Sequence, residues 1–302
     1  MRPARHGGGH TLLAACALLA AWLWSGAAQA AIAVVDDAGT TVTLAAPARR
    51  IVSLAPHATE LLYAAGAGAL VVGVSQYSDY PPAARTVASV GGAAALDIEK
   101  ILTLKPDLVV AWHNGNSAAQ IGRLRRLGIP VFESEPRDFG AVASSLERLS
   151  QLAATEVAGR AAAAAFRNRL AALRAAYGEL PPVRVFYQVW RQPLMTLNDA
   201  HLVSAALHLC GGRNVFGRLP QLAPTVSREA VLAENPEAIV VGGGAADDLA
   251  DWRRFPQMTA VARDNLFMLD ADRITRAGPR ILDGAEDMCR QLELARSRRP
   301  AS

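Results

Sequence analysis

Apolar residues in the first half of the chain form short runs, and longer helical patterns lie around them. Ile51–Leu54, Val71–Val74 and Leu108–Trp112 have the length and the branched residues of buried strands. Asp97–Leu104 and Gln120–Leu127 carry apolar residues at the spacing of one helix face. Strands that alternate with helices predict a mainly parallel sheet covered by helices on both faces.

Three local signals refine this region. Residues 31–47 alternate apolar and polar positions around an Asp-Asp-Ala-Gly turn, which predicts a β-hairpin. Thr59 is expected to cap a helix that ends at Gly66, because threonine favours helix starts and glycine favours helix ends. A further strand is expected at Ile129–Phe132.

The pattern changes over residues 138–177, which contain two glycines and no proline. Within them, Thr155–Tyr177 is rich in Ala, Arg and Leu, which are strong helix formers. At 1.5 Å per residue, this helix would span roughly 33 Å. An ordinary surface helix of one domain is the alternative, but the strand–helix pattern starts again after it, at 183–189, 202–209, 229–233 and 238–241. We therefore expect a strut between two lobes.

A repeat supports two lobes. Asp97–Val110 aligns without a gap with Ser227–Val240, and each copy has a capping residue, an acid two positions later, a proline stop and a strand. The predicted fold is α/β, with two similar, mainly parallel lobes joined by one long helix and a ligand cleft between them. The expected segments are a signal peptide (1–30), an N-terminal lobe (31–137), a linker with the backbone helix (138–180) and a C-terminal lobe (181–302).

Composition and the N-terminus indicate an exported globular protein. The 302 residues are 51% hydrophobic with a net charge of +4, too small an excess to indicate nucleic-acid binding. Arg2 and Arg5, an apolar stretch and a final Ala-Gln-Ala form a signal-peptide pattern over residues 1–30. A lipoprotein cleavage site at Cys16 is the alternative, but the apolar run continues well past Cys16. A soluble exported protein is therefore predicted.

Two cysteines, Cys210 and Cys289, would remain after export. In an oxidising compartment they suggest one disulfide, with two buried free thiols as the alternative. The chain has no G-x-S-x-G elbow, H-E-x-x-H motif or Cys/His zinc cluster, so we expect a binding protein and no enzyme. The same pocket would also serve a sensor or a chemoreceptor partner, which the sequence leaves open.

Glu99 and Glu229 occupy the same position in the two copies of the repeat, in the first turn of a helix. Each acid could simply complement its helix dipole. Alternatively, the two acids form a matched pair, one on each lobe, that engages two cationic sites on a symmetric partner.

Six segments in order give the chain a recognisable signature: Arg50–Leu61, Gly73–Pro82, Leu104–Val109, Cys210–Phe216, Val226–Glu229 and Gly278–Arg280. This signature resembles the periplasmic vitamin B12-binding proteins of ABC importers, which are class III solute-binding proteins with a helical backbone. The resemblance implies a periplasmic monomer with a ligand between lobes that hinge little, and no cofactor, since the corrinoid is transported cargo. It also implies that Glu99 and Glu229 dock on the permease dimer and that Cys210 pairs with Cys289.

The resemblance assigns pocket residues too. Tyr77 and Trp112 match aromatic positions that contact the corrin, although core packing is the alternative for both. Asp272 and Arg276 match polar residues that hold its amide side chains, and Pro56 lies within the first matching segment. Aromatic faces and a few convergent polar groups suit a flat macrocycle edged with amides.

Other positions depart from the family pattern. Ala93 and Ala223 stand where the family has tryptophans. His57 and His113 follow strands on the expected rim of the cleft, and imidazole is a good ligand for cobalt or haem iron. No metal is expected to be held directly, but either histidine could be an axial ligand of a corrinoid or of haem, and a solvated side chain is the alternative. A haem- or ferric-siderophore-binding protein of the same fold is thus the second hypothesis, and no role is assigned to His201.

Overall fold

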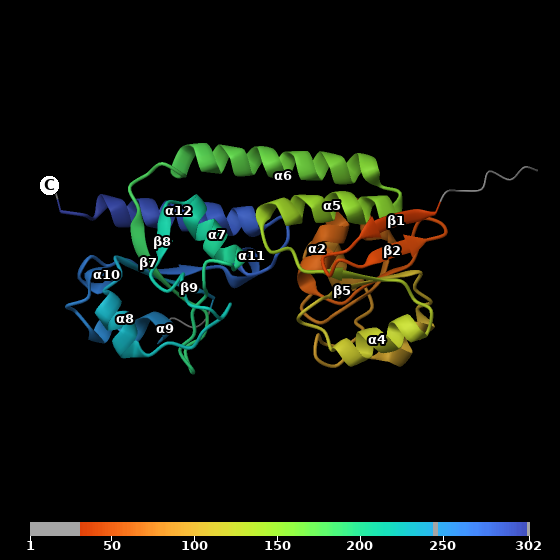
Figure 1. The fold of residues 1–302 in the computed structure, drawn as a ribbon, viewed down its shortest axis with the longest axis horizontal. Coiled ribbons are helices and arrows are strands. Elements are labelled where there is room, and N and C mark those ends of the chain that lie inside the picture. The colour runs from red at the N-terminus through yellow and green to blue at the C-terminus, as the bar shows by residue number, and fades with distance from the viewer. Residues whose placement is uncertain (1–30, 244–246, 301–302) are drawn as a thin grey trace, which may run out of the picture.

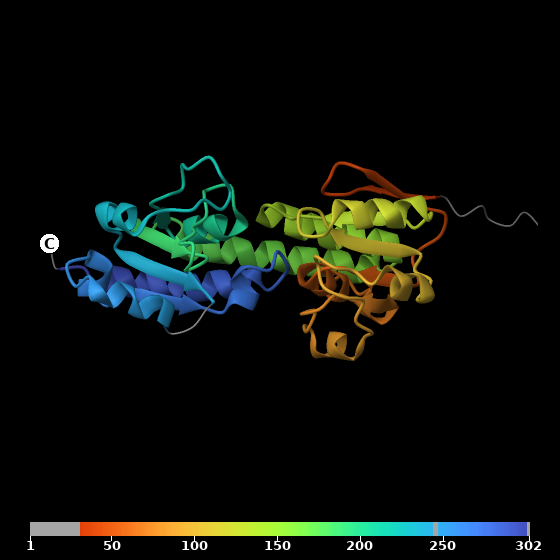
Figure 2. The ribbon, with the colours of Figure 1, turned by 90° about the horizontal axis from the view of Figure 1, so that it is seen from below.

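The structure is a computed structural model that describes residues 31–243 and 247–300. The expected signal peptide and Cys16 lie outside the described residues. Two lobes lie side by side beneath one long helix, α6 (Glu156–Tyr177), as Figure 1 shows. In the view from below, α6 runs behind both lobes (Figure 2). The predicted two-lobed α/β architecture is therefore confirmed.

The N-terminal lobe is built on a parallel sheet in the strand order β4-β3-β5-β6. Most of its strand residues are buried and many are valine, isoleucine or leucine, as expected for a sheet covered on both faces. The strands are β3 (Ile51–Ser53), β4 (Val71–Val74), β5 (Leu108–Trp112) and β6 (Val131–Ser134), and the helices are α2 (Pro56–Ala64), α3 (Ile98–Thr103) and α4 (Ala118–Arg126), with 3₁₀ turns at Gly68–Leu70 and Pro82–Thr86. The hairpin of β1 (Ile32–Val35) and β2 (Thr41–Leu44) is also as predicted.

The C-terminal lobe repeats this plan, with a parallel sheet in the order β10-β9-β7-β8. When the four strands of each sheet are numbered 1 to 4 along the chain, both sheets have the spatial order 2-1-3-4. The third strands, β5 and β9, therefore correspond to each other, as do the helices before them, α3 and α8. The internal repeat is therefore a structural repeat. The strands are β7 (Val183–Gln188), β8 (Gly212–Asn214), β9 (Ala238–Gly242) and β10 (Leu266–Leu269), and the helices are α7 (Leu202–Leu209), α8 (Arg228–Glu234), α9 (Asp247–Ala250), α10 (Thr259–Ala262), α11 (Ala271–Ile274) and α12 (Ile281–Ser297), with a 3₁₀ turn at Trp252–Arg254.

The region expected to be a linker contains two helices. The first, α5 (Phe139–Ala153), packs against α2 and β1 and is thus part of the N-terminal lobe. It ends because Ala154 adopts a left-handed conformation with φ 53°. The strut α6 contacts α2 and α5 on one side and α7 and α12 on the other. Gly159 allows α6 to approach α5, because a Cβ there would lie 2.2 Å from the Cβ of Ser150.

A few local predictions need correction. Thr59 does not cap α2, which begins at Pro56 after Ala55, because proline is well suited to the first helical position. The Thr59 hydroxyl instead donates a buried hydrogen bond of 2.8 Å to Ser53 Oγ. The strand expected at Ile129–Phe132 lies two residues later, at Val131–Ser134.

The cysteine prediction is confirmed. Cys210 and Cys289 form a disulfide that joins the end of α7 to α12. Both residues are fully buried in the core shared by these helices. Within the described ranges, no helix is long and apolar enough to cross a membrane.

Candidate ligand-binding site

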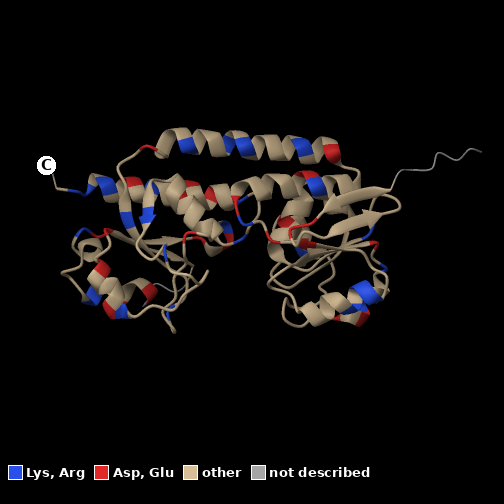
Figure 3. Cartoon of the chain, viewed as in Figure 1, with Lys and Arg blue, Asp and Glu red and all other residues tan. Residues whose placement is uncertain are grey.

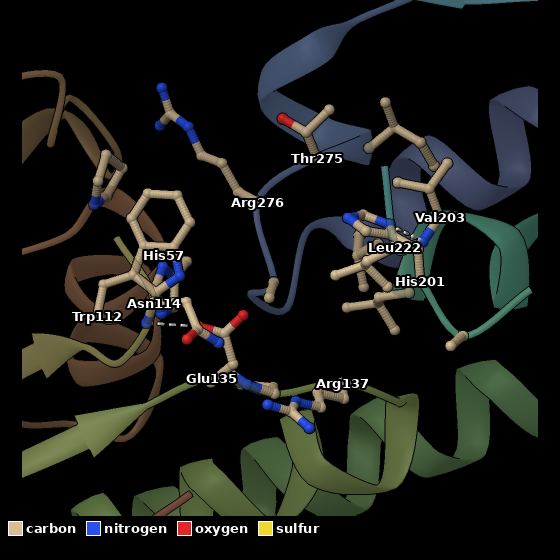
Figure 4. A pocket seen from close by; sticks show the side chains of 17 residues that line it. His57, Trp112, Asn114, Glu135, Arg137, His201, Val203, Leu222, Thr275 and Arg276 are labelled. Atoms are coloured by element: carbon tan, nitrogen blue, oxygen red, sulfur yellow. Dashed lines mark hydrogen bonds between the residues drawn. The ribbon is translucent and has the colours of Figure 1, made fainter. Parts of the chain in front are cut away.

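A cavity of about 440 Å³ lies between the lobes (Figure 4). Trp112 ends a strand, and the other lining residues lie in loops and helices beyond the carboxyl ends of strands in both parallel sheets, where ligands bind in open α/β folds. The N-terminal lobe contributes Pro56, His57, Trp112, Asn114, Glu135, Pro136 and Arg137, and the C-terminal lobe contributes Ala200, His201, Leu202, Val203, Leu222, Ile274, Thr275, Arg276, Ala277 and Ile281.

Pro56, His57 and Trp112 form one part of the N-terminal wall. Trp112 ends β5 and is 37% exposed, and its ring meets the His57 ring edge-on at 5.7 Å between centroids. His57 Nε2 lies 3.3 Å from Ser134 Oγ. Burial lowers the pKa of His57 to about 4, so this imidazole is neutral at physiological pH.

The two histidines that the sequence placed on the rim have different surroundings. His57 lies in the first turn of α2 and not in a loop, and only 6% of it is exposed. His113 does lie in the loop after β5, but it does not line the cavity, because its Nδ1 bonds to the carboxylate of Glu133. Arg125 holds the other oxygen of Glu133 at 2.6 Å. Of the two histidines, the structure thus places His57 alone among the residues that line this cavity.

Only some of the other predicted ligand residues line the cavity. Arg276 lines the cavity, whereas Tyr77 and Asp272 are not among the residues that line it. Tyr77 is 80% exposed and has a left-handed backbone with φ 64°, which is unusual for an aromatic residue. Ala93 and Ala223, at the positions of the missing tryptophans, also lie outside the lining set.

An ion-pair network beside the cavity joins the lobes, and it centres on Glu60. The Glu60 side chain, on α2, is 1% exposed and accepts hydrogen bonds from Arg280 Nη2 at 2.6 Å and from Arg280 Nε at 3.0 Å. Arg276 Nη1 lies 3.2 Å from the same carboxylate. The carboxylate raises the pKa of Arg280, and Figure 3 shows both signs of charge where the lobes meet.

The network extends to both sides of Glu60. Arg276 also pairs with Asp79 of the N-terminal lobe and with Asp272, each at 2.7 Å. Burial alone would raise the pKa of Asp79, but the Arg276 guanidinium lowers it. Arg280 stacks over the Tyr80 ring at 3.8 Å. Three carboxylates thus orient Arg276 against the cavity.

Sequence reasoning missed Glu60, Arg280 and His201. Glu60 and Arg280 fall within the segments that identified the family, but their contact spans 220 residues, which no local pattern reveals. His201 caps α7 and lines the C-terminal wall. Its position just before the apolar stretch Leu202–Leu209 was the available signal.

The two repeated acids are both exposed, in the first turns of α3 and α8. Asp97 caps α3 and Ser227 caps α8, each through a bond to a backbone N–H three residues later. Hydrogen bonds from its own backbone N–H and from the Ser227 hydroxyl lower the pKa of Glu229. The acids therefore occupy equivalent sites on the two lobes.

Comparison with known proteins places this architecture in a family. The model of the periplasmic binding protein family matches residues 51–273. The chain belongs to the periplasmic binding protein family. This periplasmic binding protein is 42% identical over 250 residues to the vitamin B12-binding protein of Vibrio cholerae, covering 82% of this chain and 91% of the relative. The vitamin B12-binding protein of Photorhabdus laumondii is 39% identical, with 80% and 87% covered.

Solved structures agree with this assignment. The crystal structure of the periplasmic vitamin B12-binding protein of Vibrio cholerae superimposes with a TM-score of 0.77 at 41% identity, covering 83% of this chain and 98% of that one. A periplasmic heme-binding protein of Roseiflexus sp. RS-1 has a TM-score of 0.73 at 24% identity, covering 82% and 99%. This second likeness shows the shared fold alone. The family and its vitamin B12-binding relatives are binding proteins and not enzymes, in line with the prediction from sequence.

Proposed function

We propose that this periplasmic binding protein captures cobalamin or a related corrinoid in the interlobe cavity and delivers it to an ABC importer. The observation that carries this proposal is the cavity between the lobes, with Trp112 on one wall and Arg276 at its edge, in a chain 42% identical to a vitamin B12-binding protein. The corrinoid is cargo and not a cofactor.

The chemistry of the cavity suits such a ligand. A corrin is a wide, flat ring whose edge carries amide side chains, so one face needs apolar contact and the edge needs hydrogen-bonding groups. Trp112 and Pro56 offer apolar surface on the N-terminal side, and Leu202 and Leu222 on the C-terminal side. Arg276 is held at the edge by its three carboxylates. The two lobes can thus bind a flat corrin ring between them.

Isothermal titration of the mature protein with cyanocobalamin, cobinamide and haemin tests the proposal. We expect cyanocobalamin to bind with a Kd below about 1 μM, which corresponds to more than about 8 kcal/mol. Trp112→Ala should weaken this binding at least tenfold, because it removes a large apolar contact. Trp190→Ala is the control, since Trp190 is 61% exposed and outside the cavity. Absence of binding by both cobalamin and cobinamide would contradict the proposal.

The haem alternative has one specific observation in its favour, the neutral imidazole of His57 at the cavity wall. A neutral imidazole can coordinate iron or cobalt. Binding of haemin without binding of either corrinoid would transfer the function to haem and make His57 the proposed axial ligand.

We further propose that Glu99 and Glu229 dock on an ABC permease dimer. The two acids are exposed on equivalent helices of the repeated lobes, which matches a partner with twofold symmetry. Glu99→Lys/Glu229→Lys should abolish stimulation of the permease and of transport, because like charges would meet across the interface. Ligand affinity should not change, since neither residue lines the cavity.

A matched control removes two exposed carboxylates elsewhere. Glu179 and Glu293 are exposed and lie in the turn after α6 and on α12. Glu179→Lys/Glu293→Lys should bind ligand and support transport normally. Equal transport by both double variants in reconstituted proteoliposomes would overturn the docking assignment.

The family is periplasmic, and we propose that the leader over residues 1–30 is removed to give a soluble protein. Cleavage after Ala30 would remove Cys16 and leave only the two cysteines of the disulfide. The mass of the exported protein distinguishes this cleavage from lipidation at Cys16.

A further inference from the structure

His201 stands out among the polar residues of the C-terminal wall. It is the residue before α7, and its Nδ1 accepts a hydrogen bond of 3.1 Å from the backbone N–H of Val203. The same side chain lines the cavity, opposite Trp112 and His57. In Figure 4 the ring nitrogen that is not bonded to Val203 points into the space between the lobes.

The capping bond fixes the proton of this imidazole. Because Nδ1 accepts a hydrogen bond, the neutral ring carries its hydrogen on Nε2. Burial lowers the pKa of His201 to about 4, so the neutral form persists at physiological pH. Among the described residues, no protein group accepts a hydrogen bond from this Nε2. The atom is also not fully buried, so a ligand in the cavity can reach it.

The polar side chains that share the C-terminal wall with His201 already have hydrogen-bond or ion-pair partners within the protein. Arg276 is bound by Glu60, Asp79 and Asp272, and the Thr275 hydroxyl donates to the Ala271 carbonyl oxygen at 2.8 Å. The residues next to His201 in the wall are the apolar Leu202, Val203 and Leu222. His201 therefore presents a directed N–H donor from an otherwise apolar surface.

We propose that His201 Nε2–H donates a hydrogen bond to an oxygen on the edge of the bound ligand and thereby orients it. This inference rests on the proposed function, which supplies a flat macrocycle between the lobes. The acceptor is a carbonyl oxygen of a corrin amide or a carboxylate oxygen of a haem propionate, and these share the same acceptor chemistry. A ligand that lacks this oxygen leaves the donor buried without a partner, so His201 contributes to specificity.

His201→Ser tests the inference without removing the helix cap. Serine is among the best N-cap residues, so α7 keeps its start, but its hydroxyl is too short to reach the ligand. We expect thermal stability to stay within about 3 °C of the wild type, because the cap is retained. The Kd for cyanocobalamin and cobinamide, measured by titration calorimetry, should rise about tenfold. His201→Asn, a second good cap, should reproduce this loss.

His208→Ser is the matched control. His208 lies on the same helix, pairs with Asp199 at 3.2 Å and does not line the cavity, so its replacement should leave the Kd unchanged. A loss for both corrinoids identifies an amide acceptor, and a loss for haemin alone identifies a propionate. Wild-type binding with an unchanged Kd in both His201 variants would overturn the inference alone. Wild-type protein that binds none of the three ligands would overturn the proposed function, and this inference with it.

Discussion

Replacing Glu60 with alanine is expected to lower the free energy of unfolding by about 3–5 kcal/mol, the usual cost of breaking a buried ion pair from one side. The Glu60 side chain is 1% exposed, and it neutralises Arg280 and part of the charge of Arg276. Without it, the Arg280 guanidinium, 17% exposed, loses its carboxylate partner and stays largely removed from water. The two lobes also lose a direct link, because Glu60 lies in one lobe and both arginines lie in the other.

Urea unfolding of the wild type and the Glu60→Ala variant measures this loss. Glu147→Ala is the matched control, since Glu147 makes a two-point contact with Arg167 at 2.6 and 2.9 Å but on the surface. Solvent screening limits such a pair to about 0–1 kcal/mol. If the two variants lost the same stability, Glu60 would not hold the lobes together in the way the geometry indicates.

The same network bears on ligand binding. Arg276 was predicted to hold the ligand, and its guanidinium is already fixed by Glu60, Asp79 and Asp272. A fixed side chain loses little rotamer freedom when a ligand arrives. The Glu60→Ala variant should therefore also bind cyanocobalamin more weakly than the wild type, while Glu147→Ala should not.

The fold was predictable because each of its signals is local or repeated. Short branched runs identified the central strands, and the repeat of Asp97–Val110 in Ser227–Val240 predicted two similar lobes, which the structure shows to share one strand order. The start of α6 was also predicted, because the expected helix Thr155–Tyr177 begins one residue before α6, but α5 was not predicted as a separate helix. Ala154 ends α5 in a left-handed conformation that sequence patterns associate with glycine or asparagine, so the end of α5 carried no recognisable signal.

Sequence reasoning reached the cavity only through local positions and the family resemblance. Pro56 and His57 follow a predicted strand, Trp112 ends another, and the resemblance assigned Trp112 and Arg276; all four line the cavity. The ion pairs of Glu60 depend on how one lobe packs against the other, and sequence spacing carries no such information. His113 illustrates the converse, because its position after β5 suggested the cleft, while Glu133 on β6 holds it away from the cavity.

Removing the disulfide with Cys210→Ala/Cys289→Ala is expected to lower the free energy of unfolding by about 4 kcal/mol. The bridge joins residues 79 positions apart, so it removes many conformations from the unfolded chain. Part of the loss will come from the two fully buried sulfur atoms themselves. Urea unfolding with and without dithiothreitol separates these contributions.

Reduction should lower the free energy of unfolding of the wild type by most of the expected loss of about 4 kcal/mol. It should leave the stability of the double variant unchanged, since the variant has no disulfide. A wild type that resists unfolding equally with and without reductant, despite verified reduction, would contradict the prediction. The bridge also anchors the end of α7, whose other end carries His201 at the cavity wall. Disulfides persist in oxidising compartments such as the periplasm, where the family works. The bridge therefore stabilises α7, and with it this wall of the cavity, in the compartment where the ligand is bound.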